Sequence, residues 1–299
     1  MRRTAILIFT AVLSLAVPGH LLADNTSPVV ITSNYPLQFF AQEIAGEALD
    51  VRLPEIEGDP AYWVPDGEQA AALQSADLVI LNGAGYESWL NFVTLRPDRL
   101  LDTTAGIEDR LLPLEKATVH QHGPEGEHSH TGTAFTTWLD PQLAIEQSRS
   151  IAKALSELAP DQAAGFKKRL AGMEVRLNQL DRELSLAFEQ LEGQPVWFSH
   201  PVYQYLESRY SINGRSVHWE PDEVPGTRSW IEFQNLSRDH PGKLMFWESE
   251  PLGEVRGQLA ELGVLSVVFE PLGNRPEQGD YFEAMGRNQQ RLIETMTVE

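Results

Sequence analysis

The chain has 299 residues, 42% of them hydrophobic and 22% charged, which is an ordinary globular composition and enough for two lobes with separate cores. Its 43 acidic and 23 basic side chains give a formal net charge of -20, which would repel a phosphate backbone and argues against a nucleic-acid-binding protein. Cysteine is absent, which excludes disulfides, cysteine-ligated zinc, iron–sulfur clusters and thiol catalysis.

Residues 1–23 have the three-part pattern of a secretory signal peptide. Arg2 and Arg3 precede an uncharged apolar run over 5–17, and Ala23 offers a small residue at the cleavage point. The run is shorter than the ~20 apolar residues that cross a bilayer. A lipoprotein would need a cysteine at the cleavage point, and the chain has none. We therefore expect a soluble mature protein in the periplasm, not a lipoprotein.

Strands and helices are predicted to alternate along residues 28–81. Short β-branched or apolar runs are typical of strands, and amphipathic runs closed by glycine or a small polar residue are typical of helices. The expected elements are strands over 28–32, 48–53 and 76–81 and helices over 36–45 and 66–75. This alternation predicts an α/β lobe built on a parallel sheet.

Residues 117–133 interrupt this pattern as a polar, glycine-containing flexible loop. The loop carries four of the chain's eight histidines as two His-x-His pairs, which are His120, His122, His128 and His130. Neutral imidazoles near Glu125 and Glu127 suit zinc, copper or nickel better than magnesium or calcium. We expect this loop to contact a metal ion.

A long helix is predicted over 160–191. Its apolar residues recur every three or four positions, at Phe166, Leu170, Met173, Leu177, Leu180, Leu184, Ala187 and Leu191. Such a helix would be roughly 48 Å long, which suits a span across two lobes. We therefore expect an N-terminal α/β lobe over 24–158, a linking helix over 159–192 and a C-terminal α/β lobe over 193–299.

The C-terminal lobe repeats the alternation of the first. The expected strands lie over 195–198, 215–219, 243–247 and 264–269, and the expected helices over 201–209, 227–239, 251–262 and 279–296. The predicted fold class is therefore α/β, with a parallel central sheet in each lobe.

Six segments form an ordered set along the chain: Ile-Thr-Ser-Asn-Tyr-Pro-Leu (31–37), Gly-Asp-Pro (58–60), the run 76–85, Trp-Leu-Asp-Pro (138–141), Phe-Ser-His-Pro (198–201) and Glu-Pro-Leu-Gly (270–273). Together they resemble the cluster A-I (ZnuA-like) solute-binding proteins of bacterial zinc and manganese ABC importers. The resemblance implies two α/β lobes joined by one long helix, with a metal between them. It also implies zinc before manganese as the bound ion and an ABC permease in the inner membrane as partner. It further implies a monomer that is not an enzyme.

The same resemblance implies four metal-ligand positions, and two of them are changed in this chain. Where the family usually has histidine, the sequence has Ala61 and Thr136. Alanine has no donor atom, and a neutral threonine hydroxyl is a poor zinc ligand. The other two positions match His200 and Glu270, each expected at the carboxyl end of a strand, where α/β proteins bind ligands.

The candidate metal ligands are therefore His200, Glu270, His128, His130, His120 and His122, with Asp59 and His218 as further candidates. Glu248 and Glu250, in Trp-Glu-Ser-Glu-Pro (247–251), resemble the Glu-Pro strand end of the family, which implies a structural role. Two roles of the His-rich loop remain open: it replaces the lost ligands, or it captures metal outside the main cleft. Two other functions also remain open. One is a periplasmic zinc chaperone or buffer acting through the loop, and the other is binding of a non-metal solute. A zinc hydrolase using His200 and Glu270 is a weaker alternative, because the His-Glu-x-x-His signature is absent.

Overall fold

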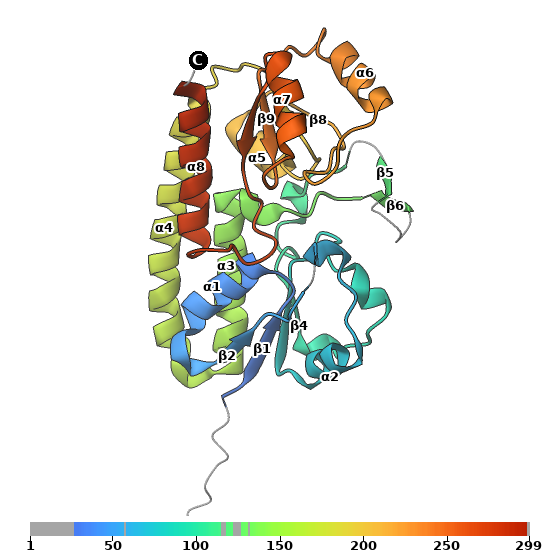
Figure 1. Cartoon of the computed structure of the whole chain (residues 1–299). Coiled ribbons are helices and arrows are strands. Elements are labelled where there is room, and N and C mark those ends of the chain that lie inside the picture. Colours follow the sequence, from blue (N-terminus) through green and yellow to red (C-terminus); the bar gives the residue numbers. More distant parts are fainter. Residues whose placement is uncertain (1–26, 57, 115–117, 122–126, 131, 298–299) are drawn as a thin grey trace, which may run out of the picture.

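The computed structural model describes residues 27–56, 58–114, 118–121, 127–130 and 132–297. Two four-stranded parallel sheets, one in each lobe, form its framework (Figure 1). This confirms the predicted fold class. The expected signal peptide over residues 1–23 lies outside the described residues, as does His122. No helix in the described part of the chain has the length and apolarity that a bilayer crossing needs.

The N-terminal sheet has the strand order β2-β1-β3-β4, with all neighbours parallel. Its strands are β1 (Val29–Thr32), β2 (Asp50–Arg52), β3 (Leu78–Leu81) and β4 (Leu100–Asp102). Helices α1 (Tyr35–Ala45), α2 (Gly67–Ser75) and α3 (Pro141–Leu158) accompany it. All four residues of β3 are buried, as expected for a parallel strand covered on both faces.

The C-terminal sheet has the order β10-β9-β7-β8, again parallel throughout. Its strands are β7 (Val196–Phe198), β8 (Gly214–Ser216), β9 (Leu244–Trp247) and β10 (Leu265–Val268). Its helices are α5 (Gln204–Tyr210), α6 (Thr227–Leu236), α7 (Gly253–Glu261) and α8 (Tyr281–Thr297). In both sheets the second strand in the sequence lies on one side of the first and the third strand on the other. Each lobe therefore has the same topology, with a switch point between its first and third strands.

Local signals explain where the helices begin. The side chain of Asn34 caps α1 by accepting a hydrogen bond from the Leu37 N–H at 3.1 Å. Asp66 and Gln69 form a capping box at the start of α2. Asp140 caps α3 and is followed by proline at the first helical position.

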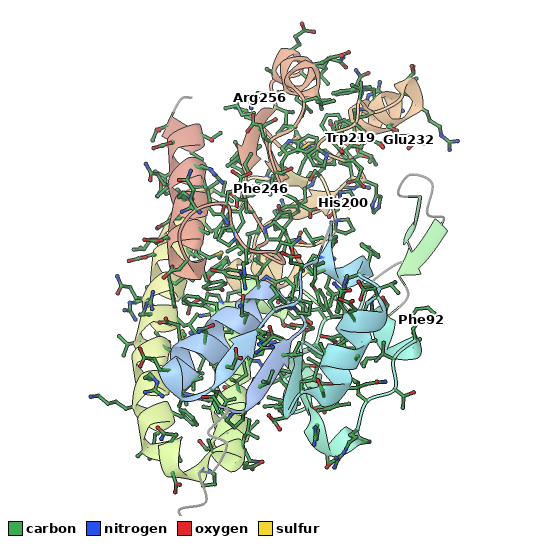
Figure 2. The ribbon with its side chains drawn as sticks, turned by 60° about the horizontal axis from the view of Figure 1, so that its bottom comes forward. Phe92, His200, Trp219, Glu232, Phe246 and Arg256 are labelled. Carbon is green, nitrogen blue, oxygen red and sulfur yellow. The ribbon has the colours of Figure 1, made fainter. Side chains whose placement is uncertain are left out.

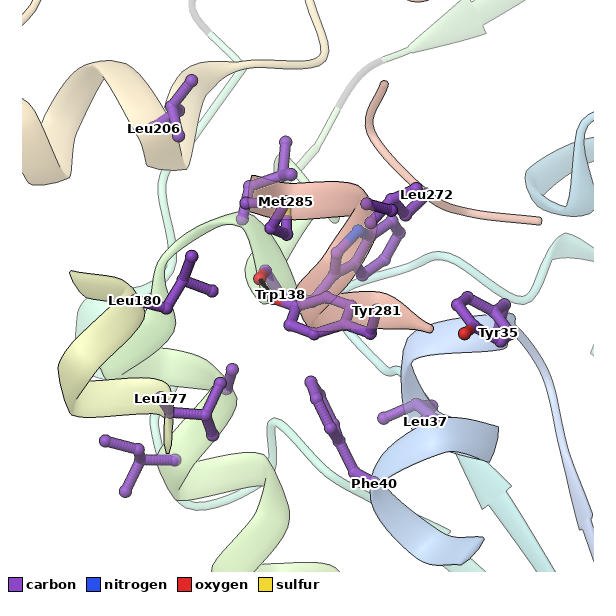
Figure 3. Packing of buried hydrophobic residues seen from close by; sticks show 14 of the residues in the cluster. Tyr35, Leu37, Phe40, Trp138, Leu177, Leu180, Leu206, Leu272, Tyr281 and Met285 are labelled. Carbon is purple, nitrogen blue, oxygen red and sulfur yellow. Dashed lines mark hydrogen bonds between the residues drawn. The ribbon is translucent and has the colours of Figure 1, made fainter. Parts of the chain in front are cut away.

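Helix α4 (Ala163–Glu189) runs along both lobes (Figure 1). It packs against α1 and α3 of the N-terminal lobe and against α5 and α8 of the C-terminal lobe. Its 27 residues correspond to about 40 Å, shorter than expected, because residues 160–162 form a separate 3-10 turn and the helix ends at Glu189. Figure 3 shows Leu177 and Leu180 of α4 packing near Trp138 and Tyr281 in a core that is continuous across the lobes.

Besides the long helix, two further expected elements differ in the structure. Residues 117–133 were expected to be a loop without regular structure, but the described part contains the antiparallel strands β5 (Thr118–Gln121) and β6 (Glu127–His130). Their register pairs His120 with His128. Strands form here because antiparallel pairing satisfies backbone donors and acceptors that an irregular loop would leave to water. The strand expected over 215–219 is β8, which ends at Ser216.

Candidate metal centre

The candidate site lies at the switch point of the C-terminal sheet. His200 follows β7 and Glu248 follows β9, and these strands are neighbours although β8 lies between them in the sequence. The chain leaves β7 toward one side of the sheet and returns to β9 on the other, which opens a crevice at the carboxyl ends of the strands. Figure 2 shows His200 on the side of the C-terminal lobe that is turned toward the N-terminal lobe.

Two carboxylates face the two ring nitrogens of His200. Its Nε2 lies 3.2 Å from Oε1 of Glu220, and its Nδ1 lies 3.5 Å from Oε1 of Glu248. The His200 side chain is only 10% exposed, so these charges interact through little water. The ring of His218 stands nearly perpendicular to that of His200, with the centroids 6.1 Å apart.

Backbone pairing brings residues 217–220 to this place. The Val217 N–H donates to the Phe198 carbonyl at 2.8 Å, and the Trp219 N–H donates to the Ser199 carbonyl at 3.0 Å. These bonds extend the pairing of β7 beyond the end of β8. Trp219 is buried in an aromatic cluster with Trp230 and Phe233, which fixes this segment.

The charges around His200 shift its titration. Burial would lower the pKa of His200, but the hydrogen bond with Glu220 and the charges of Glu248 and Glu220 outweigh it, so the pKa is raised. Burial also raises the pKa of Glu248 to about 7. The charge of His200 opposes that rise, while those of Asp59 and Glu220 add to it. The carboxylates around His200 therefore give this centre an excess of negative charge, which favours the binding of a cation.

Asp59 reaches the same region from the N-terminal lobe. Its carboxylate accepts a hydrogen bond from the Ala61 N–H at 2.9 Å and caps the 3-10 turn Pro60–Tyr62. Burial raises the pKa of Tyr62, and the charges of Asp59, Glu248 and Glu220 raise it further. The charges of three carboxylates, drawn from both lobes, thus act on one phenol.

Ala61 and Thr136 stand where the resemblance implies histidine ligands. Ala61 is buried and has only a methyl group. Thr136 is buried too, and its hydroxyl donates to the Val202 carbonyl at 2.6 Å, which ties the two lobes together.

Glu270 lies near the end of β10, and its carboxylate pairs with a cation. Oε1 accepts a hydrogen bond from Nη1 of Arg291 at 2.7 Å. Its backbone is clamped by Asn288, whose amide oxygen accepts from the Glu270 N–H at 3.0 Å and whose NH2 donates to the Glu270 carbonyl at 2.8 Å. Glu270, Glu248, Asp59 and Thr136 all line a cavity of about 990 Å³ between the lobes.

The predicted ligands are therefore only partly brought together. The rings of His200 and His218 lie 6.1 Å apart, and Asp59 of the other lobe acts by its charge on Glu248. His120, His128 and His130 lie on the strands β5 and β6, and only their backbone pairing is described. Within the described ranges, no three His, Asp or Glu side chains are already placed to hold a metal ion together.

Sequence reasoning missed Glu220 and took Glu248 as structural. Glu248 follows the carboxyl end of β9 as His200 follows that of β7. Only the strand order shows that β7 and β9 are neighbours, so that the two side chains lie close together. Glu220 lies two residues after His218 in an extended segment, a spacing that could have marked both side chains for one face.

A family model described as "ZnuA: Zinc-uptake complex component A periplasmic" matches residues 30–295. The zinc-binding lipoprotein AdcA of Streptococcus pneumoniae is 25% identical over 282 residues, covering 90% of this chain and 56% of that protein. The chain thus spans about half the length of this relative. The metal-dependent lipoprotein YcdH of Bacillus subtilis has a similar fold, with a TM-score of 0.76, 21% identity and coverage of 90% of this chain and 99% of that chain. The Zn(II)-bound ZnuA-like domain of S. pneumoniae AdcA also has a similar fold, with a TM-score of 0.74 and 21% identity. The match covers 90% of this chain and 98% of that chain.

Proposed function

The chain belongs to the ZnuA family of zinc-uptake components, and from this membership we propose that it binds zinc in the periplasm and delivers the ion to the permease of an ABC importer. The proposed cargo is Zn²⁺, with Mn²⁺ less favoured because the site contains imidazoles. The protein acts by binding and release, without making or breaking a covalent bond.

The observation that carries this proposal is the surroundings of His200. An imidazole with its two nitrogens 3.2 and 3.5 Å from carboxylate oxygens offers the donor types that zinc binds, in a crevice shielded from bulk water. The carboxylate of Asp59 adds negative charge from the opposite lobe. Names of relatives support zinc as the ion, since the pneumococcal relative is a zinc-binding lipoprotein.

His200 is the ligand on which the proposal depends. Glu270 and the histidines of the His-rich segment (His120, His122, His128 and His130) are the ligands proposed from the sequence, together with Asp59 and His218. The signal-peptide pattern and the family's description as periplasmic support the proposed location. The ABC permease remains the proposed partner on the strength of the family alone.

Zinc titration against a competing chelator, followed by calorimetry, tests this proposal on three proteins. They are the mature wild type, His200→Ala and a deletion of residues 120–130. We expect one tight site in the wild type that His200→Ala abolishes. His240→Gln is the control, because His240 lies at the far end of β7, with Nε2 2.8 Å from the Val196 carbonyl.

Each other result has a distinct meaning. If none of the proteins binds zinc more tightly than roughly 1 μM, about −8 kcal/mol, zinc uptake is the wrong function and a non-metal solute becomes the leading candidate. If His200→Ala keeps the tight site and the deletion loses it, the protein is a zinc buffer that acts through its His-rich segment.

A further inference from the structure

Ala61 and Thr136, which stand where the resemblance implies histidine ligands, both lie in the N-terminal lobe. On the other side of the crevice, residues 217–220 carry two side chains of metal-binding type beside His200. We infer that the metal site of this chain is built within the C-terminal lobe, from His200, His218 and Glu220, with Glu248 orienting His200. This inference rests on the proposed function and names the ligands of its site.

The spacing of His200 and Glu220 already suits one zinc ion. Tetrahedral zinc with bonds of about 2.0–2.1 Å to N and O has donor atoms roughly 3.3 Å apart along each edge. Nε2 of His200 and Oε1 of Glu220 are 3.2 Å apart. The ion would therefore enter beside this pair and replace the attraction between the two groups with two metal–ligand bonds.

His218 is the third ligand. Two imidazoles on one tetrahedral zinc have ring centroids roughly 5 Å apart. The rings of His200 and His218 are 6.1 Å apart, so a side-chain rotation of His218 that closes about 1 Å completes the set. Without that rotation the three side chains do not form one metal-binding group, in keeping with the described part of the chain, where no such group is found.

The burial of the Trp219 indole explains why His218 and Glu220, its neighbours in the sequence, lie on the side of the segment that faces His200. In an extended segment, residues 218 and 220 point away from the side taken by residue 219. Trp219 is 4% exposed, and its ring packs against those of Trp230, Phe233 and Trp247. With the indole fixed in this core, His218 and Glu220 are held on the opposite side, where His200 lies.

Glu248 acts as a positioning residue. Its Oε1 lies 3.5 Å from Nδ1 of His200, on the ring nitrogen opposite the one that faces Glu220. The negative charge of a carboxylate near that nitrogen favours the proton on Nδ1 and leaves the lone pair of Nε2 for a metal. Glu270, in contrast, has its carboxylate 2.7 Å from Arg291, a cation that a metal would have to displace.

The donor set defines the class of ion. Two imidazoles and one carboxylate suit a borderline divalent ion such as zinc, and they fit magnesium and calcium poorly because those ions prefer oxygen ligands. Three protein ligands leave a fourth position for water or for a group from the N-terminal lobe.

The test measures zinc affinity by chelator competition in the wild type and in Glu220→Gln, His218→Ala, Glu248→Gln and Glu270→Gln. We expect Glu220→Gln and His218→Ala each to weaken binding by more than about 100-fold, and Glu248→Gln by 10–100-fold, as is typical of an orienting partner. Glu270→Gln tests the ligand implied by the sequence and should weaken binding less than Glu220→Gln does. The matched control is Glu223→Gln, an exposed residue three positions after Glu220, which should stay within about threefold of the wild type.

Cobalt(II) spectra separate a lost ligand from a damaged fold. The wild type and Glu248→Gln should both show the visible bands of tetrahedral cobalt, whereas His218→Ala should lose or shift them while the near-ultraviolet circular dichroism of its tryptophans is retained. If the wild type binds zinc tightly and only Glu270→Gln weakens it, the inference is overturned and the proposed function stands. If the wild type itself fails to bind zinc, the proposed function fails instead.

Discussion

The indole of Trp138 and the carbonyl of Pro271 join the two lobes by one hydrogen bond, with Nε1 donating at 2.6 Å. The Trp138 carbonyl in turn accepts from the hydroxyl of Tyr281 at 2.8 Å. The Tyr35 N–H donates to the Gly273 carbonyl at 3.0 Å. These bonds fasten the segment that follows β10 to the N-terminal lobe, within a core that spans both lobes.

Replacing Trp138 should therefore lower the free energy of unfolding of the protein. Trp138→Phe removes the donor to Pro271 and leaves a cavity at a side chain that is 2% exposed. We expect a loss of about 2–4 kcal/mol in the free energy of unfolding, measured with urea. Trp230→Phe, at a partly exposed tryptophan, is the matched control and should cost less. A Trp138 variant as stable as the wild type would show that this contact contributes little.

The lobes should move little when the ion binds. Besides the contacts of Trp138, the Thr136 hydroxyl donates to the Val202 carbonyl at 2.6 Å and the Tyr205 hydroxyl donates to the Ala134 carbonyl at 2.8 Å. The continuous helix α4 also offers no short hinge to absorb large dihedral changes. X-ray scattering curves of the apo and zinc-loaded protein should nearly superimpose. A marked decrease in the radius of gyration on loading would contradict this view.

The fold class could be predicted because its signals are local. The continuous burial of β3 and the apolar stripe of α4 follow directly from hydrophobic periodicity. The end of β8 was misplaced because residues 217–219 keep strand-like backbone bonds to residues 198–199 after the assigned strand has ended. That pairing depends on tertiary contacts, which periodicity does not reveal.

The candidate site was harder to predict for the same reason. His200 could be proposed from its motif. Glu220 and Glu248 reach it only through the strand order that places β7 beside β9 and through the backbone bond between Trp219 and Ser199. Glu270 forms an ion pair with Arg291 of α8, and a sequence pattern does not reveal this contact either.

A buried carboxylate in the N-terminal lobe should make stability depend on pH. Glu87 is 7% exposed and accepts hydrogen bonds from the Ser33 hydroxyl at 2.6 Å and from the N–H groups of Asn82 and Gly83 at 2.6 and 3.1 Å. Burial raises the pKa of Glu87 to about 7 despite these bonds, against an ordinary value of 4.5. Between these two values the folded state holds a proton that the unfolded state has lost, so stability falls as pH rises.

Urea unfolding of the apo protein at pH 5, 6, 7 and 8 measures this effect when the wild type is compared with Glu87→Gln. The variant loses hydrogen-bond acceptors and should be less stable at every pH, but it lacks the titration. The advantage of the wild type over the variant should therefore shrink by up to about 1.4 kcal/mol per pH unit between pH 5 and 7 and then level off. Parallel curves for the two proteins would mean that Glu87 keeps the same pKa in both states.

The carboxylates around His200 should also be visible in its own titration. Without metal, the hydrogen bond with Glu220 and the charges of Glu248 and Glu220 outweigh burial and raise the pKa of His200 above its ordinary value of 6.5. Because zinc competes with the proton on this ring, zinc affinity should begin to fall as pH drops through that raised pKa, earlier than for an exposed histidine.

Proton NMR of the imidazole ring in the apo protein measures this pKa directly. Glu248→Gln removes one of the negative charges that face the ring, so the His200 titration should move to lower pH, and the fall in zinc affinity should move with it. The group that faces Nε2, Glu220, stays in place in this variant, as do Asp59 and His218. The His240 ring lies at the other end of β7, with Nε2 2.8 Å from the Val196 carbonyl, and its resonance serves as the internal reference. An unchanged His200 titration in Glu248→Gln would show that this carboxylate does not act on the ring, and its assignment as the residue that orients His200 would then fail.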